Sequence, residues 1–387
     1  MSSPLRTIPP GSTLGMLGGG QLGRMALLAG RRLGYRFHVY EPAPHCSAAP
    51  VAEKTFSSAW NDETALAEFA RGIAAVTLEF ENVPATTLQF LEKRVPARPG
   101  LRVLKTCQNR RQEKEFLRRN GFPCADFAVV NSAAQLATAT KKLGLPCVMK
   151  TAVSGYDGKG QLKLPAFPLE GAVDWDMVWR TFGAAEAVVE KWIPFTAECS
   201  VIVARSVRGE MAAFPMAENE HRQHILHRSI AAARLPAKVQ RAGAELAKDI
   251  AEKLGVVGLL AVEMFYVNGK LLINELAPRP HNSGHYTLDA CLTSQFEQHI
   301  RCAVGLPLGA PDLLRPAVMI NLLGDCWHRD RAPDWSKLLK DSRVKLHLYD
   351  KGEPRPGRKM GHFTVVDEKL DRAIKLADQL YAGLSVD

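Results

Sequence analysis

Two glutamates stand in a stretch that otherwise consists of buried β-structure. Glu263 and Glu275 lie within residues 258–285, GLLAVEMFYVNGKLLINELAPRPHNSGH, where apolar side chains dominate. Two carboxylates that share a partly buried face repel each other and lose hydration, at roughly several kcal/mol per ion, which a cation offsets. Hard oxygen ligands suit Mg²⁺, which also binds substrate phosphates. The pair indicates a metal site, and the alternative is that each glutamate meets an arginine or lies at a strand end.

The pairing of this hairpin decides whether the two glutamates can share one ion. Residues 259–267 and 270–276 are β-rich runs that meet at Asn268-Gly269, a strong signal for an antiparallel hairpin. A two-residue turn would pair position 263 with position 274 and send Glu275 to the opposite face. A three-residue loop with a left-handed Gly269 would put both glutamates on one face, roughly 7–8 Å apart as diagonal neighbours. We predict the three-residue loop.

A glycine-rich turn follows the first predicted strand. Residues 13–17 form an apolar strand, residues 18–23 have the pattern G-x-G-x-x-G, residues 24–33 have helical spacing, and a second strand, 36–40, ends in Glu41. This βαβ opening is typical of a dinucleotide site, because glycines let the backbone approach a phosphate at a helix N-terminus. A tight packing turn explains the same residues equally well, and NAD binding is the third interpretation.

A second candidate phosphate site follows the predicted strand 145–149. Lys150 ends this strand and precedes the glycine-rich loop TAVSGYDGKG, residues 151–160. The lysine would supply a point charge and the loop N–H donors, although the pattern is not that of a Walker loop. An ordinary hairpin connection is the alternative. Further along the chain, residues 218–221, ENEH, are predicted as a polar turn.

Composition narrows the class of protein. The 387 residues are enough for two or three domains, and 46% hydrophobic with 23% charged residues is ordinary for a soluble globular protein. We find no signal-peptide h-region and no apolar run of transmembrane length, so we expect a cytoplasmic protein without membrane contact. Eight cysteines without a C-x-x-C pair predict reduced thiols rather than a zinc or disulfide framework. The net charge of +10 comes from dispersed residues, which favours small anionic substrates over nucleic acid.

Separated motifs in the chain together resemble a known family. They are GGGQLGRM (18–25), TLEFENVP (77–84), SGYDGKGQ (154–161), INELAPRPHNSGHYT (273–287) and RPGRKMGH (355–362). In this order and spacing they resemble the N5-carboxyaminoimidazole ribonucleotide synthetases, ATP-grasp enzymes of purine biosynthesis, over about residues 13–365.

This resemblance implies an α/β and α+β architecture with the ATP-grasp fold. An N-terminal Rossmann-like βαβ domain would span residues 1–106. The ATP-grasp domain, with a central and a lid part, would span 107–315, and a small substrate-side domain would span 316–387. The resemblance also implies a homodimer.

The reaction that the resemblance implies has three substrates. ATP phosphorylates bicarbonate to carboxyphosphate, which supplies CO₂ or a carboxyl group to the exocyclic amine of 5-aminoimidazole ribonucleotide, with Mg²⁺ or Mn²⁺ as the cofactor. Another ATP-grasp carboxylate–amine ligase, such as a formate-using ribonucleotide transformylase or a biotin carboxylase, is the first alternative. An NAD-dependent oxidoreductase and a non-catalytic nucleotide-binding module are the others.

The resemblance also assigns residues to the site. Glu263 and Glu275 match the metal ligands, and Asp157, Lys351 and Arg279 match catalytic positions, the first two for the amine proton and the nascent carboxyl group. The ATP contacts are Arg110, Lys150, Gly155, Tyr156, Asp157, Gly158, Lys159, Gly160, Gln161, Glu190, Lys191, Trp192, Ile193, Glu198, His221, Asn274 and Glu275. The substrate contacts are Gln21, Leu22, Glu79, Asn82, Tyr156, Asp157, Arg279, His281, Lys351 and Arg358, with the 5′-phosphate near the glycine turn.

Two local departures from the family pattern stand beside the predicted sites. Ala152-Val153-Ser154 replaces the more usual arginine- and glycine-rich residues before the glycine loop, which bears on loop flexibility or one phosphate contact. His224 stands where a glycine is usual, which raises the question of the backbone conformation there.

Overall fold

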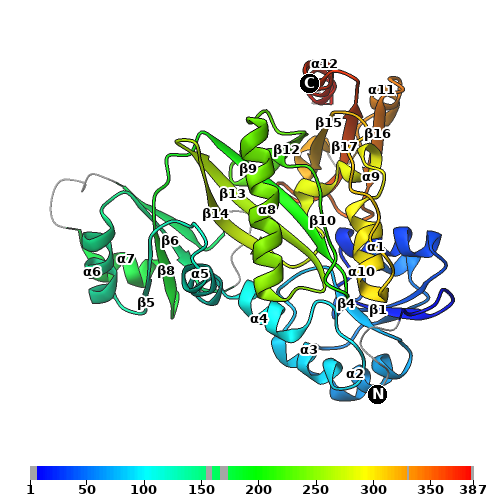
Figure 1. Ribbon diagram of the computed structural model, residues 1–387, viewed down its shortest axis with the longest axis horizontal. Helices are drawn as coiled ribbons and strands as arrows, with labels where there is room; N and C mark the ends of the chain where they lie inside the picture. The colour runs from blue at the N-terminus through cyan, green and yellow to red at the C-terminus, as the bar shows by residue number, and fades with distance from the viewer. Residues whose placement is uncertain (1–6, 154–158, 166–172, 329–330, 385–387) are drawn as a thin grey trace.

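The first part of the chain is a parallel sheet covered by helices. The computed structural model describes residues 7–153, 159–165, 173–328 and 331–384 (Figure 1). The sheet has the order β3-β2-β1-β4, and its parallel pairing follows from the buried apolar runs that the sequence predicts. Its elements are β1 (Thr13–Leu17), α1 (Gln21–Arg32), β2 (Arg36–Tyr40), η1 (Ala49–Val51), β3 (Lys54–Phe56), α2 (Glu63–Arg71), β4 (Val76–Leu78), α3 (Ala85–Glu92) and α4 (Leu101–Gln108).

A small antiparallel sheet forms the arm at the left of Figure 1. Its strand order is β5-β8-β6-β7, and the helices α6 and α7 lie beside it, with their apolar residues in the same core cluster. The helix α5 (Arg110–Arg119) precedes this sheet and is capped by Asn109, whose side chain accepts a hydrogen bond from the Gln112 N–H at 3.0 Å. The other elements are β5 (Phe127–Val130), α6 (Ala133–Leu143), β6 (Cys147–Thr151), β7 (Gln161–Leu164), α7 (Trp175–Phe182) and β8 (Ala187–Lys191).

A second antiparallel sheet, nine-stranded within the described residues, forms the body of the molecule. Its order is β14-β13-β9-β11-β12-β15-β17-β16, with β10 paired to β9. The long helix α8 crosses one face of β9, β13 and β14 (Figure 1), because its apolar side chains pack in the same cluster as those of the strands. The elements up to this helix are β9 (Ala197–Arg205), β10 (Met211–Ala213), β11 (Ala217–Arg222), β12 (Ile225–Ala231) and α8 (Ala237–Leu254).

The rest of the chain extends the same sheet and returns to the first domain. β12 pairs with β15, so one sheet joins residues before and after the predicted boundary at 315/316. The division of the chain at residues 106 and 315 stays a prediction. The helix α10 packs against α1 through a shared apolar cluster. The remaining elements are β13 (Gly258–Val267), β14 (Lys270–Ala277), η2 (Asn282–Gly284), α9 (Thr287–Ala290), α10 (Gln295–Val304), β15 (Ala317–Leu323), η3 (Gly324–Cys326), α11 (Trp335–Leu339), β16 (Val344–Leu348), β17 (Lys359–Val366) and α12 (Leu370–Ala382).

One predicted turn is wrong. Residues 218–221, expected as a polar turn, lie inside β11, and the chain reverses at Gln223-His224. Their charged side chains misled the prediction, because Glu218 and Glu220 meet arginines: the Arg234 guanidinium binds both, at 3.0 Å from Glu220, and Arg228 binds Glu220 at 2.8 Å. A strand can carry such residues where cross-strand partners neutralise them.

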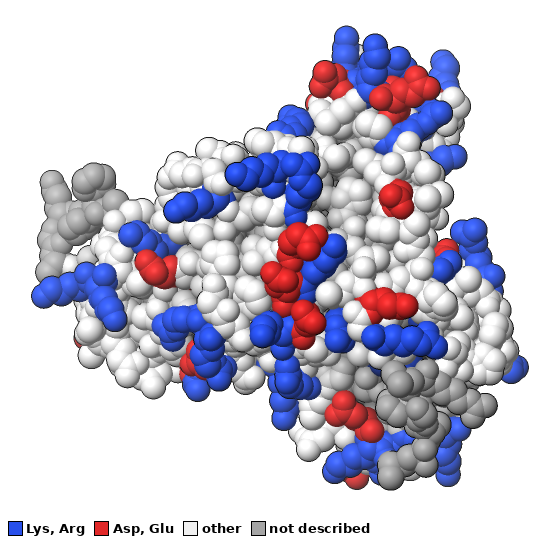
Figure 2. Space-filling model, in the orientation of Figure 1, with Lys and Arg blue, Asp and Glu red and all other residues white. Residues whose placement is uncertain are grey.

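Surface charge and the cysteines agree with the expectations from composition. All eight cysteines are free, and five of them are buried. Lysine and arginine side chains are scattered over the face shown in Figure 2, with acidic side chains among them. Among the helices described, none combines the length and the apolar character needed to cross a bilayer.

Candidate active site

The hairpin that carries the two glutamates turns at Asn268-Gly269. Both residues have positive φ, 48° and 77°, and Val267 pairs directly with Lys270. The connection is therefore the two-residue turn with left-handed central residues that Asn-Gly favours. The predicted three-residue loop is wrong, because Asn268 tolerates the left-handed conformation that the shorter turn requires.

A β-bulge inside the hairpin nevertheless puts both glutamates on one face. Met264 pairs with Ile273 and Glu263 pairs with Glu275, so Asn274 is the extra residue of β14. With the two-residue turn alone, Glu275 would lie on the face of the sheet opposite to Glu263. The one extra residue of the bulge shifts the register by one and returns Glu275 to the face of Glu263. The prediction of a shared face is confirmed, with the two carboxylate residues directly opposite rather than diagonal.

The hairpin forms part of the wall of a large cavity. The cavity has a volume of about 1260 Å³ and is lined by residues of both antiparallel sheets, of α1 and of the segment that follows β4. Many of the residues predicted for the ATP, metal and substrate sites line it together. These are Gln21, Leu22, Glu79, Asn82, Arg110, Lys150, Gln161, Glu190, Lys191, Trp192, Ile193, Glu198, His221, Glu263, Asn274, Glu275, Arg279 and His281.

Other predicted residues lie elsewhere. Gly155, Tyr156, Asp157 and Gly158 fall outside the described residues, so the predicted loop contacts and the role of Asp157 stay predictions. Lys159, Gly160, Lys351 and Arg358 are described but do not line the cavity. Arg358 donates to the backbone oxygen of Glu353 at 2.9 Å. The ammonium of Lys351 lies 5.9 Å from the centre of the Tyr349 ring. Burial raises the pKa of Glu79, and the positive charge of Lys351 opposes part of this rise.

The pKa values of the two hairpin glutamates are shifted in opposite directions by their surroundings. Burial alone would raise the pKa of Glu263, but His281 and His221 outweigh it and lower the pKa to about 2. The ring Nε2 of His281 is 2.9 Å from a carboxylate oxygen of Glu263. Burial raises the pKa of Glu275. The guanidinium of Arg110, 3.8 Å away, opposes this rise, and the negative charge of Glu263 adds to it. Glu263 is therefore ionised, and Glu275 gains from any further positive charge.

The residues present fit a divalent metal ion. The donors that face each other are carboxylate oxygens, the ligand type that Mg²⁺ and Mn²⁺ prefer. Glu263 and Glu275 belong to neighbouring strands of one sheet, and their side chains are 25% and 39% exposed, so an ion between them would also reach a ligand in the cavity. Glu263 and Glu275 would hold the ion, as the sequence predicts.

Lys150 and Glu190 belong to a buried ionic network. The Lys150 ammonium lies 3.1 Å from one carboxylate oxygen of Glu190 and 3.3 Å from the side-chain oxygen of Asn274. Lys114 of α5 lies 3.3 Å from the other oxygen of Glu190 and is fully buried. Burial would raise the pKa of Glu190, but Lys114 and Lys150 lower it to about 2. Sequence reasoning missed Lys114, because a lysine in a charged helix is by default solvated.

The glycine turn already binds carboxylates of the chain itself. The N–H groups of Gly20 and Gly23 donate to Glu79, at 2.7 Å for Gly23, and the Gly19 N–H donates to Glu41 at 3.0 Å. These donors stand where a dinucleotide pyrophosphate would bind at the α1 N-terminus. The turn therefore holds Glu79 at the cavity, and NAD would have to displace two carboxylates.

Arg279 and His221 are each held by a carboxylate. Arg279 forms a two-point contact with Glu81, and both side chains are largely buried. His221 contacts Glu198, which raises the pKa of the imidazole against the effect of burial. Glu81 was not among the predicted site residues, and only its place in TLEFENVP, two residues after Glu79, pointed to it.

An aromatic pair in the cavity was also missed. Phe195 and Phe265 stack with ring centres 4.6 Å apart and planes 6° apart, and both line the cavity. Phe195 remains 38% exposed although it is a large apolar side chain. Flat apolar surface at a polar cavity suits the face of a planar ring. The sequence signal was weak, because one of the two rings follows a proline in a connection.

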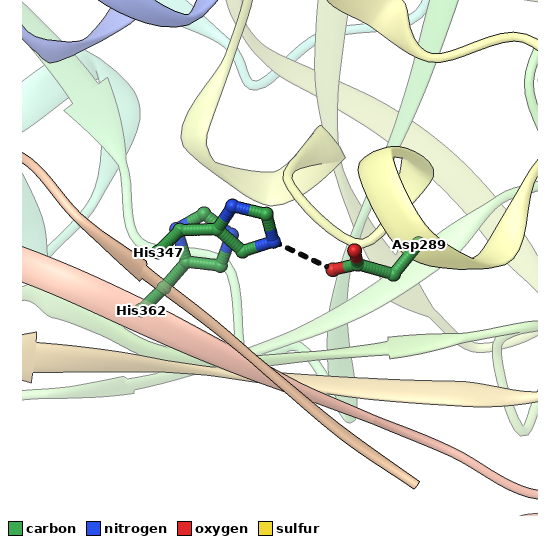
Figure 3. A group of neighbouring side chains, drawn as sticks. All are labelled: Asp289, His347 and His362. Atoms are coloured by element: carbon green, nitrogen blue, oxygen red, sulfur yellow. Dashed lines mark hydrogen bonds and ion pairs between the residues drawn. The ribbon is translucent and has the colours of Figure 1, made fainter. Parts of the chain in front are cut away.

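A histidine cluster lies between α9 and the strands β16 and β17. The rings of His347 and His362 are stacked, 4.6 Å and 16° apart, and His347 is hydrogen-bonded to Asp289 at 2.9 Å (Figure 3). A metal ion needs ligand lone pairs that converge, whereas the lone pairs of two stacked rings run parallel. Burial lowers the pKa of His362 well below its ordinary value, so this ring is neutral. The cluster joins Asp289 to the sheet through hydrogen bonding and stacking.

The structure describes both departures from the family pattern except for Ser154, which lies outside the described residues. His224 has φ 66° and Gln223 has φ 50°, so a non-glycine residue occupies a left-handed position in the β11–β12 turn. Ala152 is buried and its carbonyl oxygen accepts a hydrogen bond from the Arg110 N–H at 2.8 Å, whereas Val153 is exposed. The backbone oxygen thus ties the start of α5 to the end of β6.

This arrangement defines the class of the protein. An antiparallel sheet in the arm faces a larger one that carries paired carboxylates, with a polar cavity between them, and this is the architecture of an ATP-grasp protein. Sequence profiles agree, since residues 12–108 match the ribonucleotide synthetase preATP-grasp domain, 115–296 the ATP-grasp domain and 317–376 the phosphoribosylaminoimidazole carboxylase C-terminal domain.

Individual relatives identify the family. The N5-carboxyaminoimidazole ribonucleotide synthase of Bacillus subtilis is 42% identical over 369 residues, 95% of each chain. The chain belongs to the N5-carboxyaminoimidazole ribonucleotide synthase family of ATP-dependent ligases. It is also 44% identical to the bifunctional purine synthesis protein purC/E of Dictyostelium discoideum, of which it spans 37% of the length.

Solved structures show the same fold. An ADP complex of an N5-carboxyaminoimidazole ribonucleotide synthetase has a TM-score of 0.89 at 43% identity, over 97% of this chain and 98% of that one. The Aspergillus clavatus synthase, solved with ADP and 5-aminoimidazole ribonucleotide, has a TM-score of 0.85 at 28% identity, over 96% of this chain and 98% of that one.

Proposed function

We propose that this protein uses ATP and bicarbonate to carboxylate 5-aminoimidazole ribonucleotide to N5-carboxyaminoimidazole ribonucleotide, through carboxyphosphate, in purine biosynthesis. The observation that carries the proposal is the face-to-face pair Glu263 and Glu275, in a cavity that also receives Lys150 and Glu79. Residues proposed for the nucleotide and the metal, and part of those proposed for the ribonucleotide, would thus face one volume, as transfer of a phosphoryl group to bicarbonate beside the amine requires.

The proposed roles follow from position and charge. Mg²⁺ or Mn²⁺ held by Glu263 and Glu275 would neutralise charge on the phosphoryl group. Lys150 and Arg110 both line the cavity, where their positive charges would bind ATP phosphates. Phe195 and Phe265 offer a flat surface for the base. Lys191, Trp192 and Ile193 supply the strand edge of β8 beside it.

The ribonucleotide would bind on the side of the first domain. Glu79, held by two N–H groups of the glycine turn, accepts hydrogen bonds and suits the sugar hydroxyls rather than a phosphate. Arg358 and Lys359 lie at the end of the loop between β16 and β17, and they would bring positive charge to the 5′-phosphate. Asp157 and Lys351 are proposed for the amine proton and the nascent carboxyl group. A homodimer in the cytoplasm completes the proposal.

A phosphate-release assay tests this function. We expect turnover of ATP that requires both bicarbonate and 5-aminoimidazole ribonucleotide, with the carboxylated product identified by mass spectrometry of a ¹³C-bicarbonate reaction. Turnover with bicarbonate that does not depend on the ribonucleotide would contradict the substrate assignment. Formate in place of bicarbonate tests the transformylase alternative, and saturable NAD(H) binding without ATP binding would favour the oxidoreductase.

A further inference from the structure

The bulge at Asn274 lies on the outer edge of a sheet. β14 is the edge strand of the large sheet, so the backbone groups on its far side have no neighbouring strand in that sheet. A bulge leaves its extra residue outside the ladder and locally disrupts the pairing. Unpaired backbone groups that are buried are destabilising, so each needs a partner. The conformation of the bulge, and with it the direction of the Glu275 side chain, therefore depends on what binds this edge.

Two consecutive residues of α5 bind the backbone on either side of Glu275. The Lys114 ammonium donates to the carbonyl oxygen of Asn274 at 2.9 Å. The Glu113 carboxylate accepts a hydrogen bond from the Leu276 N–H at 2.8 Å. Just before the bulge, the Ile273 N–H donates to the carbonyl oxygen of Pro123, which follows α5. Side chains and one carbonyl of a helix segment thus replace the missing strand.

Burial makes these contacts specific. Glu113 is 2% exposed and Lys114 is 0% exposed, although both belong to a helix whose sequence, RRQEKEFLRR, is strongly charged. Ionisable side chains are almost never fully buried unless ion pairs or hydrogen bonds offset the free-energy cost of their desolvation. Lys114 also contacts Glu190, whereas the hydrogen bond that Glu113 accepts comes from the bulge backbone. Glu113 therefore offers the cleaner test.

We propose that Glu113 and Lys114 are positioning residues, which hold the bulge of β14 in the shape that sets the carboxylate of Glu275 opposite that of Glu263. Neither side chain lines the main cavity, and Glu113 lines a small pocket beside it together with Glu275. The inference rests on the proposed function, because it takes Glu263 and Glu275 as the metal ligands. It adds a reason why the metal site depends on a helix that contributes no ligand to it.

The proposal is tested by measuring how tightly the full chain binds Mn²⁺ alone. Electron paramagnetic resonance of the free ion gives the amount that remains unbound. Glu113→Leu removes the acceptor for the Leu276 N–H and keeps a similar volume. We expect it to weaken Mn²⁺ binding about tenfold, the change that losing one buried hydrogen bond produces. Glu113→Gln keeps an acceptor oxygen at the same place and is expected to bind Mn²⁺ within about twofold of the native protein. The KM for 5-aminoimidazole ribonucleotide should stay unchanged in both variants, which a general loss of structure would not allow.

Controls separate the possible results. Lys105→Met changes an exposed lysine of the neighbouring α4 and should bind Mn²⁺ like the native protein. If Glu113→Leu does not fold, Lys114→Met removes the other contact and carries the same expectation. Native Mn²⁺ affinity in a folded Glu113→Leu or Lys114→Met variant would overturn the positioning role. Native affinity in Glu263→Gln would instead refute the metal site itself.

Discussion

Replacing Glu263 by glutamine removes one charge from the proposed metal site and little else. Its side chain is 25% exposed and contacts the His281 ring, and the amide can occupy the same volume. A carboxylate and one unit of positive charge about 4 Å apart attract each other by about 4 kcal/mol at an effective dielectric constant of about 20. If that attraction supports phosphoryl transfer, turnover falls about a thousandfold. Phosphate release at saturating ATP, bicarbonate and ribonucleotide, over a range of Mg²⁺ concentrations, measures the loss.

The control for this variant is Glu245→Gln on α8. Glu245 is 68% exposed and pairs with the surface residue Lys248, so the same chemical change should leave turnover unaltered. Circular dichroism and thermal unfolding should show that Glu263→Gln keeps the native fold. Turnover within tenfold of the native protein, with the same Mg²⁺ dependence, would refute the assignment of Glu263 as a metal ligand.

Three further predictions concern stability. A carboxylate whose pKa is lower in the folded protein stabilises the fold at pH values above its ordinary pKa of 4.5, and this stabilisation is lost as the pH falls towards about 2. In urea unfolding at pH 2–6, Glu190→Gln should therefore lack up to about 3 kcal/mol of the acid-dependent change in unfolding free energy. An unchanged pH profile would contradict the pairing of Glu190 with the two lysines. His224→Gly should raise the unfolding free energy by about 1 kcal/mol, because glycine accepts the left-handed φ of 66° without strain, and equal or lower stability would count against it. Glu81→Ala leaves the buried charge of Arg279 unpaired and should lower the unfolding free energy by about 3–5 kcal/mol in guanidinium titrations, whereas a loss below about 1 kcal/mol would show that water compensates the charge.

The amino-acid sequence by itself determined the local elements and the family. Strands 13–17 and 36–40 match the structure, because short apolar runs between turn signals have few alternatives. The turn at Asn268-Gly269 was correctly located but given the wrong length, since both lengths obey the same local signal. The motifs pointed to the ATP-grasp family because their chemistry is concentrated in short segments that change little with context.

Only the tertiary structure decided how the charged residues are paired. Lys114, Glu113 and Glu81 resemble solvated charges in the sequence, yet each is buried against a partner at least 75 residues away, Glu190, Leu276 and Arg279. The bulge at Asn274 likewise has no local signature, since its backbone partners come from α5, about 160 residues earlier. Distant contacts of this kind depend on how the arm and the large sheet meet. The sequence therefore predicted the shared face of Glu263 and Glu275, and the packing of α5 against β14 supplied the bulge that produces it.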